Sequence, residues 1–239
     1  ACLPAAFLSN LAYLKFGEPV QPKESKGQGT MGWQLFSANP ILLYLISIVL
    51  VSQVVSAVLD YKFQGLLSIE FEGKPDAETA FQGWFFGTLN TSVLLLQFAI
   101  TPLLLSFVAL RWVHIVMPII HVVAITMAII EPTVLTVGLA YFLFKAFDYS
   151  IFRAAKELLY VPLSFDERYR AKEIIDVFGY RAGKGASSVV IIALQNLGIV
   201  MSNYYLATAF VATSIWLGLI FPLTKRASKN EDSSHADSK

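Results

Sequence analysis

Residues 39–59 read NPILLYLISIVLVSQVVSAVL, and no charged side chain interrupts this stretch. A helix that crosses the hydrocarbon core of a bilayer needs about 20 consecutive, predominantly apolar residues, so the stretch predicts a membrane-spanning helix. Pro40 suits the first turn of such a helix, because the N–H that proline lacks would have no partner there. The charged residues Asp60 and Lys62 follow the apolar run. We therefore predict a first membrane span over residues 39–59.

The composition of the whole chain also indicates a membrane protein. Of its 239 residues, 56% are hydrophobic and only 15% are charged, whereas soluble domains carry about 25% charged residues. The formal net charge of +1 gives no electrostatic basis for binding nucleic acid. The single cysteine, Cys2, excludes a disulfide framework and a cysteine-based metal site within the chain.

Five further apolar stretches follow the first span. They cover residues 80–110, 112–130, 134–144, 188–202 and 204–223. The third of these differs from the others, because helix-forming sequence continues past Phe144 to Tyr160 and carries several charges. We predict an all-helical, polytopic bundle of six transmembrane helices over residues 39–224, with the lipid bilayer as its surroundings.

The flanking segments and connections predict how the bundle is oriented. Residues 1–16 are interpreted as the end of a preceding helix, residues 17–38 as a cytoplasmic linker and residues 225–239 as a disordered cytoplasmic tail. Lysine and arginine are concentrated in every second connection, including the turn at Arg111 and the segment 161–186. Because positively charged connections stay in the cytoplasm, both ends of the bundle are predicted to be cytoplasmic.

The charged continuation of the fourth span carries the main functional candidates. Lys145, Asp148 and Lys156 share one face of the predicted helix, and Tyr149 and Arg153 lie on an adjacent face. Ionisable groups inside a membrane cost about 2.5–3.5 kcal/mol each on insertion scales, so they face the bundle interior or water and mark solute pathways. The alternative is that only the first half of this helix is in lipid, with the charges at the cytoplasmic interface.

Polar residues in two other spans are weaker candidates. Gln82, Asn90 and Gln97 fall on roughly one side of the second span, where they would either line a substrate path or form hydrogen bonds between helices. His114 and His121 are one heptad apart in the third span, and about 10 Å along a helix is too far for two ligands of one metal. We predict neither a metal site nor a cofactor.

A longer segment resembles a known family. Residues 149–188 read YSIFRAAKELLYVPLSFDERYRAKEIIDVFGYRAGKGASS. The pieces YSIF, KELLYVPL, AKEIIDV and RAGK are similar, without gaps, to the ATP/ADP translocases, the nucleotide transporter family of obligate intracellular bacteria and plastids that is related to the major facilitator superfamily. Two charges differ, since Asp148 stands where the family has a lysine and Arg153 where it has an aspartate.

The resemblance implies a function, an architecture and a set of site residues. This chain would be the C-terminal half of a twelve-helix facilitator-type transporter, with an N-terminal six-helix half in the same parent chain or in a second subunit. It would exchange nucleotides by alternating access across a bacterial inner membrane. The substrate-binding candidates are Lys145, Asp148, Arg153, Lys156 and Glu157, of which the resemblance singles out Lys156 and Glu157. Gln82, Asn90, Gln97 and Tyr149 are lining candidates, and Asp176, Arg181 and Lys184 are candidates for a gate in the cytoplasmic loop.

Two other functions stay open from the residues alone. One is a carrier of another organic anion or metabolite that is coupled to protons through Asp148 or Glu157. The other is a non-transporting membrane scaffold or sensor whose charged segment 161–186 docks a cytoplasmic partner. The sequence contains no Ser-His-Asp, paired-carboxylate or metal-spacing pattern, so an enzyme is not predicted.

Overall fold

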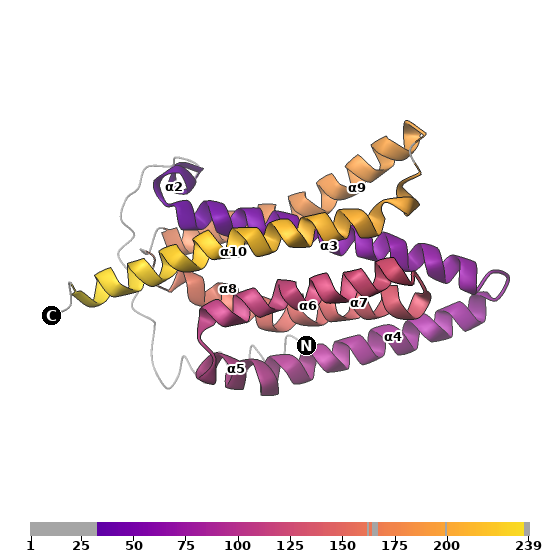
Figure 1. Ribbon diagram of the computed structural model, residues 1–239, viewed down its shortest axis with the longest axis horizontal. Coiled ribbons are helices and arrows are strands. Elements are labelled where there is room, and N and C mark those ends of the chain that lie inside the picture. The colour runs from indigo at the N-terminus through magenta and orange to yellow at the C-terminus, as the bar shows by residue number, and fades with distance from the viewer. Residues whose placement is uncertain (1–32, 162, 164–166, 199, 237–239) are drawn as a thin grey trace, which may run out of the picture. The chain divides into compact units, whose positions relative to one another are not determined.

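Long α-helices run side by side in the computed structural model of this protein (Figure 1). The structure describes residues 33–161, 163, 167–198 and 200–236. The predictions for residues 1–16 and for most of the linker 17–38 lie outside the described residues. Within the described ranges every regular element is a helix, so the predicted all-helical fold class is confirmed.

The described helices divide into long spans and short connecting segments. The α-helices are α2 (Trp33–Ala38), α3 (Pro40–Glu70), α4 (Pro75–Leu95), α5 (Thr101–Phe107), α6 (Leu110–Ile130), α7 (Val134–Phe147), α8 (Arg153–Tyr160), α9 (Tyr180–Asn196) and α10 (Tyr205–Ala236). Short π-helical segments are η1 (Leu96–Ile100), η2 (Asp148–Phe152), η3 (Glu167–Ala171) and η4 (Ile174–Gly179), and η5 (Met201–Asn203) is a 3-10 turn. The segment η1 joins α4 to α5, and η2 joins α7 to α8, without a break in the helix.

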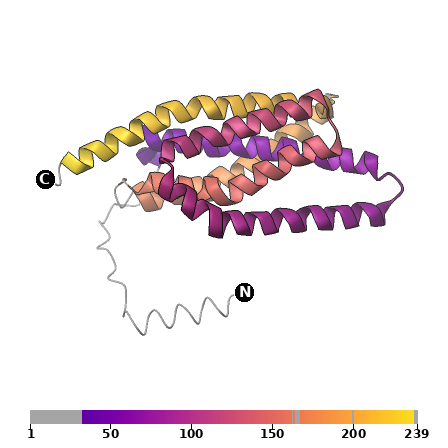
Figure 2. The same ribbon diagram turned by 60° about the horizontal axis from the view of Figure 1, so that its bottom comes forward.

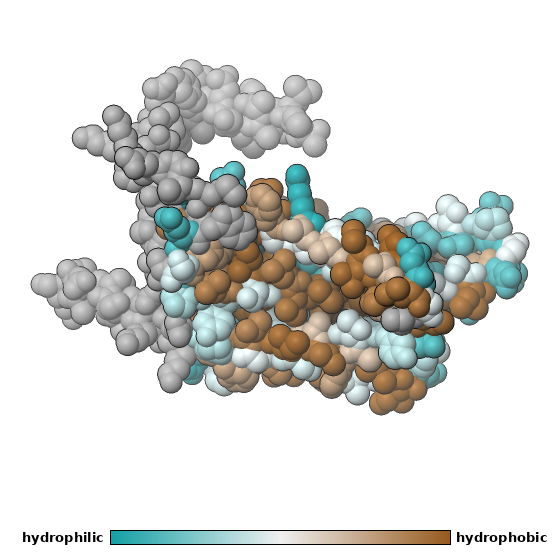
Figure 3. Space-filling view, turned by 90° about the horizontal axis from the view of Figure 1, so that it is seen from above, coloured by the Kyte–Doolittle hydropathy of each residue, from teal (hydrophilic) through white to brown (hydrophobic). Residues whose placement is uncertain are grey.

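Five helices of the described part are long and apolar enough to cross a membrane. They are Pro40–Glu70, Pro75–Phe107, Leu110–Ile130, Val134–Tyr160 and Tyr205–Thr224. Apolar side chains dominate the flank of these helices in a space-filling view, and hydrophilic ones gather toward the ends (Figure 3). Backbone polar groups in lipid must be satisfied internally, and continuous helices do this. The chain is therefore a polytopic helical membrane bundle.

The remaining predicted span falls on a helix, α9, that is not among these five and has other boundaries than those expected. The sequence placed it over residues 188–202, but α9 begins at Tyr180 and ends at Asn196. Gly198 follows with a φ of +80°, a left-handed conformation that glycine adopts without steric cost and that stops the helix. The stretch 180–187, which precedes the predicted span, is therefore the first half of α9.

Two long helices extend beyond their predicted apolar stretches. The helix α3 continues eleven residues past Leu59 to Glu70, because Phe63 and Leu67 prolong the buried stripe at four-residue intervals and are themselves fully buried. The helix α10 is helical to Ala236, whereas a disordered tail was expected over residues 225–239. No glycine or proline interrupts the sequence after Pro222, so nothing local breaks this helix.

The central helix of the bundle is α3, which packs against α7, α9 and α10 (Figure 2). The ring centroid of Phe63 on α3 lies 4.6 Å from that of Phe85 on α4 and 5.5 Å from that of Tyr141 on α7. The three rings thus join α3, α4 and α7. Gly183 brings α9 close to α3, since an added Cβ would lie 2.8 Å from Gln53 Cβ. Small residues that allow such close approach are the usual means of packing helices in lipid.

Candidate functional site

The span α7–η2–α8 carries the charged face predicted from sequence. Thr133 caps its first turn in a capping box with Thr136, and the helix then crosses from apolar residues into the charged ones. The π-helical segment Asp148–Phe152 interrupts the α-helical pattern in the middle of the charged region. Single π-helical turns within α-helices are rare and occur frequently at functional sites. The charged face is thus built around a local irregularity of the helix.

Lys145 lies inside the bundle and reaches across to α3. Its side chain is 7% exposed, and its Nζ donates a hydrogen bond of 2.7 Å to Ser56 Oγ. The Tyr149 hydroxyl is 3.4 Å from the same nitrogen. The ring centroids of Tyr149 and Tyr141 are 5.2 and 5.7 Å away, within the range of cation–π attraction. The ammonium is held by one hydroxyl at close range and two aromatic faces.

Asp148 is the most deeply buried carboxyl group of the described residues. Its side chain is 3% exposed, and among those residues its Oδ1 has no hydrogen-bond partner. Lys145, Arg153 and Lys156 are the cations that act on it electrostatically. A buried carboxylate oxygen without a partner is costly. The site therefore has an unused acceptor in the midst of three cations.

Arg153 and Tyr149 form the exposed part of the same face. The guanidinium carbon of Arg153 lies 5.8 Å from the Tyr149 ring centroid, and both side chains are exposed. A guanidinium presents a planar fork of donors that matches a phosphate group in a two-point contact. Arg153 is the cation of this face that an incoming ligand reaches without displacing an internal partner.

Lys156 is more deeply buried and is paired with a carboxylate. Its side chain is 2% exposed, and its Nζ forms an ion pair with Asp176 of η4, which is 33% exposed. The Tyr180 ring centroid lies 4.8 Å from the same ammonium. The pair joins the charged helix to the segment that leads into α9. Asp176, a predicted gate residue, thus contacts Lys156, a predicted substrate residue.

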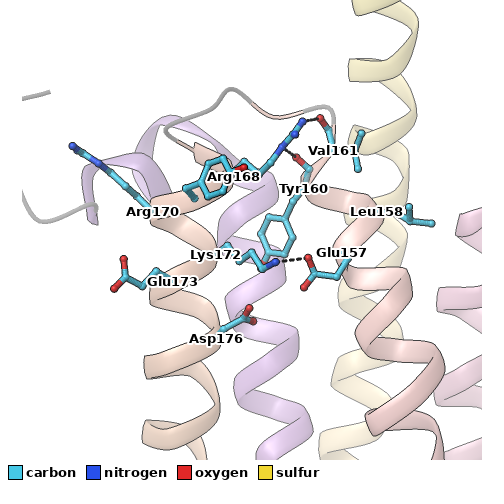
Figure 4. Close-up of a pocket in the computed structure, with 10 residues that line it drawn as sticks. Glu157, Leu158, Tyr160, Val161, Arg168, Arg170, Lys172, Glu173 and Asp176 are labelled. Carbon is cyan, nitrogen blue, oxygen red and sulfur yellow. Dashed lines mark hydrogen bonds and ion pairs between the residues drawn. The ribbon is translucent and has the colours of Figure 1, made fainter. Parts of the chain in front are cut away.

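A second ion pair is formed by Glu157, the residue after Lys156 on α8. Lys172 Nζ is 2.6 Å from Glu157 Oε2, and both side chains are well exposed. Arg168 donates to the backbone carbonyl oxygens of Tyr160, at 3.1 Å, and of Val161. Figure 4 shows Lys172 pointing toward Glu157 while Arg168 reaches the end of α8. Because terminal carbonyl groups of a helix lack internal partners, Arg168 serves as a cap for α8.

These contacts border a pocket of about 660 Å³ between α8 and the η3–η4 segment. Its walls carry charges of both signs, and Figure 4 shows Arg170 extending away from the others. The lining residues are Glu157, Leu158, Tyr160, Val161, Arg168, Tyr169, Arg170, Lys172, Glu173 and Asp176. The pocket is open at the end of the charged span, beside the Lys156–Asp176 pair.

The remaining predicted residues lie elsewhere. Gln82 donates to Glu78 at 3.1 Å and to Gln64 at 3.4 Å, near the start of α4. Asn90 and Gln97 are exposed on α4 and η1, and Arg181 and Lys184 are exposed on α9. The structure thus brings Lys145, Asp148, Tyr149, Arg153, Lys156, Glu157 and Asp176 into one region, and it leaves Gln82, Asn90, Gln97, Arg181 and Lys184 outside it.

His114 and His121 lie within the packed core of α6. The His121 ring is 5.2 Å from that of Phe144 and 5.6 Å from that of Trp216, measured between centroids. No group of three or more His, Cys, Asp or Glu side chains in the described residues is arranged to hold a metal ion. The two histidine rings lie against aromatic rings of η2, α7 and α10.

Two contact residues of the site had only weak signals in the sequence. Ser56 lies on a polar face of an otherwise apolar span, and its partner Lys145 is 89 residues away. Lys172 precedes Asp176 by four residues, so both lie on the side of one helical turn that meets α8. Asp176 and Lys172 carry charges opposite to those of Lys156 and Glu157, with which they pair. This charge complementarity is the pattern that could have identified Lys172.

The charged span lies within a segment that matches a known protein family. Residues 75–226 match the family described as TLC ATP/ADP transporter. The chain belongs to this family. The match runs from the start of α4 into α10 and includes every site residue predicted from sequence. It confirms the resemblance that was based on the motifs between Tyr149 and Ser188.

The chain is also similar to individual carrier proteins. ADP,ATP carrier protein 1 of Chlamydia muridarum is 24% identical over 234 residues, which cover 89% of this chain and 44% of that protein. ADP,ATP carrier protein 1 of Rickettsia bellii is 31% identical over 86 residues, which cover 34% of this chain and 17% of that protein. This chain spans less than half the length of the Chlamydia relative. No solved structure matches the chain.

Proposed function

We propose that this chain is half of a secondary carrier that exchanges nucleotides of the ATP/ADP type across a bacterial inner membrane. The observation that carries the proposal is the burial of Lys145 and Lys156 on one spanning helix, within the segment that matches the TLC family. Buried cations in a membrane span are costly and mark solute pathways. The names of the Chlamydia and Rickettsia relatives supply the substrate class.

The architecture that we propose has six spans in this chain and a second six-helix half. The sixth span is α9, whose 17 residues give a helix of about 25 Å, slightly short of the hydrocarbon thickness. Six crossings put both ends of the bundle on the same side, which the lysines and arginines of the connections assign to the cytoplasm. Alternating access would then be a rocking of the two halves about a midplane site.

The substrate is held by its phosphate groups in this proposal. Arg153 is exposed and makes the first, two-point contact, and Lys145 and Lys156 add point charges deeper in the bundle. Because Lys156 is paired with Asp176, a phosphate oxygen has to replace the carboxylate of Asp176. The replacement would release the η4 segment from α8, so that substrate binding and opening of the cytoplasmic gate occur together. Arg181 and Lys184, exposed on α9, would attract the anion toward this gate.

Nucleotide exchange by the full-length protein in proteoliposomes tests the proposal. Uptake of labelled ATP should require unlabelled ADP inside the vesicles and should fall to background in Lys156→Gln. The matched control is Lys74→Gln, which removes an exposed lysine in the α3–α4 connection and should leave uptake unchanged. Wild-type rates in Lys156→Gln would contradict the assignment of the site, and a wild-type protein without nucleotide uptake would contradict the function.

A second candidate function is favoured by the unpartnered oxygen of Asp148. A buried carboxyl group that has no fixed partner can carry a proton through a transport cycle, so the chain would then be a carrier of an organic anion coupled to protons. In the same vesicles, uptake driven by a pH gradient with no internal nucleotide, and lost in Asp148→Asn, would favour this alternative. Uptake that depends on internal nucleotide alone would reject it.

A further inference from the structure

We propose that Ser56 is a positioning residue that holds the Lys145 ammonium in the site while leaving its charge available to an anionic substrate. Ser56 lies on α3, outside the segment of the family match, and it is 2% exposed. Its Oγ accepts the 2.7 Å hydrogen bond from Lys145 Nζ. The inference rests on the proposed function for its link to transport, but the geometry of the pair does not depend on that function.

The contact with Ser56 is the strong polar contact of Lys145. Among the residues that the structure describes, the other polar atom near Nζ is the Tyr149 hydroxyl, at the long distance of 3.4 Å. The ring faces of Tyr141 and Tyr149 stabilise the charge but accept no conventional hydrogen bond. Loss of the Ser56 hydroxyl would leave a buried ammonium short of partners, so the Lys145 side chain would move toward solvent.

Lys145 differs from Lys156 because its hydrogen-bond partner Ser56 is neutral. Lys156 is paired with the carboxylate of Asp176, so its charge is compensated at contact distance. Within the described ranges, the hydrogen bonds of Lys145 go only to hydroxyl groups. A hydroxyl fixes the direction of an ammonium without cancelling its charge. Asp148 interacts with this ammonium electrostatically, but no carboxylate of the described residues pairs with it at contact distance. Lys145 therefore remains an attractive partner for a phosphate group even when the gate is closed.

The chain provides a matched control one helical turn away. Ser52 is also on α3 and fully buried, but its hydroxyl donates to the Val49 carbonyl oxygen of the same helix at 2.8 Å. The substitution Ser52→Ala thus removes the same group from the same helix without touching Lys145. Ser56→Cys keeps the size of the side chain and replaces the hydroxyl by a weak acceptor, so it serves if Ser56→Ala fails to insert.

The first experiment measures nucleotide uptake kinetics for these variants in full-length protein. Hydrogen bonds to charged groups are strong, so Ser56→Ala should raise KM for labelled ATP by about tenfold or more, with a smaller change in maximal rate. Ser56→Thr should retain the wild-type KM. Ser56→Asp should raise KM as well, because its carboxylate would hold Lys145 but neutralise it. A wild-type KM in both Ser56→Ala and Ser56→Asp would overturn the inference.

The second experiment is independent of transport. Reductive methylation with formaldehyde, read out by mass spectrometry, reports how accessible the Lys145 amine is. Methylation of Lys145 should be faster in Ser56→Ala and Ser56→Cys than in the wild type, and unchanged in Ser52→Ala. Equal methylation in all variants would overturn the inference even if the protein exchanges nucleotides. Faster methylation in a protein that takes up no nucleotide would uphold the position of Lys145 and reject the proposed function instead.

Discussion

The spans α4–η1–α5 and α7–η2–α8 have the same order of helical segments but differ in how far other helices enclose them. Both are interrupted by a π-helical segment, and η1 packs against η2. Of the most apolar 18 residues of each span, 11% are buried in the first and 56% in the second. The polar residues Asn90 and Gln97 of the first are exposed, whereas Lys145 and Lys156 of the second are buried and bonded to other helices.

The difference shows that a polar residue in an apolar span does not by itself indicate a buried site. On α7–η2–α8 the polar groups are enclosed by α3, η4 and the tyrosine rings, so their cost in lipid is offset by specific partners. On α4–η1–α5, Asn90 and Gln97 are exposed, so the rest of the described bundle does not enclose them. We expect substitutions on the enclosed face to change stability and transport, and substitutions on the α4 face to change neither strongly.

The largest effect should come from separating the buried charge pair. Asp176→Asn leaves Lys156 buried opposite a neutral group and should destabilise the protein by about 3 kcal/mol, near the lower end for buried pairs because Asp176 is partly exposed. Thermal unfolding in lipid nanodiscs measures this loss. Glu173→Gln, in the wall of the same pocket, is the control and should leave the unfolding temperature unchanged. The exchange Lys156→Asp with Asp176→Lys should recover part of the loss, and no recovery would argue against a direct pair.

A change at Arg153 should affect binding and leave stability intact. Arg153 is exposed and makes no ion pair among the described residues, so Arg153→Gln removes only the two-point contact with phosphate. We expect KM for labelled ATP to rise by about tenfold, as for loss of a charged hydrogen bond, at an unchanged unfolding temperature. Arg153→Lys should be intermediate. A loss of stability without a change in KM would assign Arg153 to the structure of the bundle.

A smaller effect is expected from the exposed pair Glu157–Lys172. Exposed ion pairs contribute about 0–1 kcal/mol, so Lys172→Gln should lower stability slightly and change nucleotide uptake by no more than about fivefold. A double-mutant cycle with Glu157→Gln in nanodiscs measures the coupling between the two side chains. A coupling energy as large as that between Lys156 and Asp176 would contradict the expectation that the buried pair contributes more to stability than the exposed pair.

The smallest effect is expected on α4. Asn90→Ala and Gln97→Ala remove exposed amides, so uptake should stay within about twofold of the wild type, the range of surface substitutions. Uptake kinetics of both variants, beside Lys145→Ala, give the comparison directly. Losses equal to that of Lys145→Ala would show that the α4 face also binds substrate.

The sequence predicted the helical bundle because long apolar stretches leave few alternatives to membrane helices. It located the ends of α6 and of the α7–η2–α8 span closely, where charges or prolines flank the helix. It missed the extension of α3 to Glu70 and the early start of α9 at Tyr180. Both helices continue through polar residues because packing partners elsewhere in the chain support them, and hydropathy along the sequence does not record such partners.

The candidate site was predictable to a similar extent. The charges of the fourth span could be identified because ionisable groups are costly inside a membrane. Their partners could not, since Ser56 is an ordinary serine in an apolar helix and meets Lys145 only through the packing of α3 on α7. Asn90 and Gln97 were weaker candidates, as neutral polar residues on one side of an apolar span. The packing of the helices leaves them exposed, whereas it encloses Lys145.

Photolabelling with an azido-ATP analogue tests most directly the central claim that the charged face of α7–η2–α8 binds the nucleotide. The full-length protein in liposomes would be irradiated with the analogue, with and without excess ATP, and the modified peptides would be identified by mass spectrometry. We expect modification that excess ATP prevents, within residues 141–184 and weaker in Arg153→Gln. Protected modification confined to α4 or to the other half of the protein, or none at all, would contradict it.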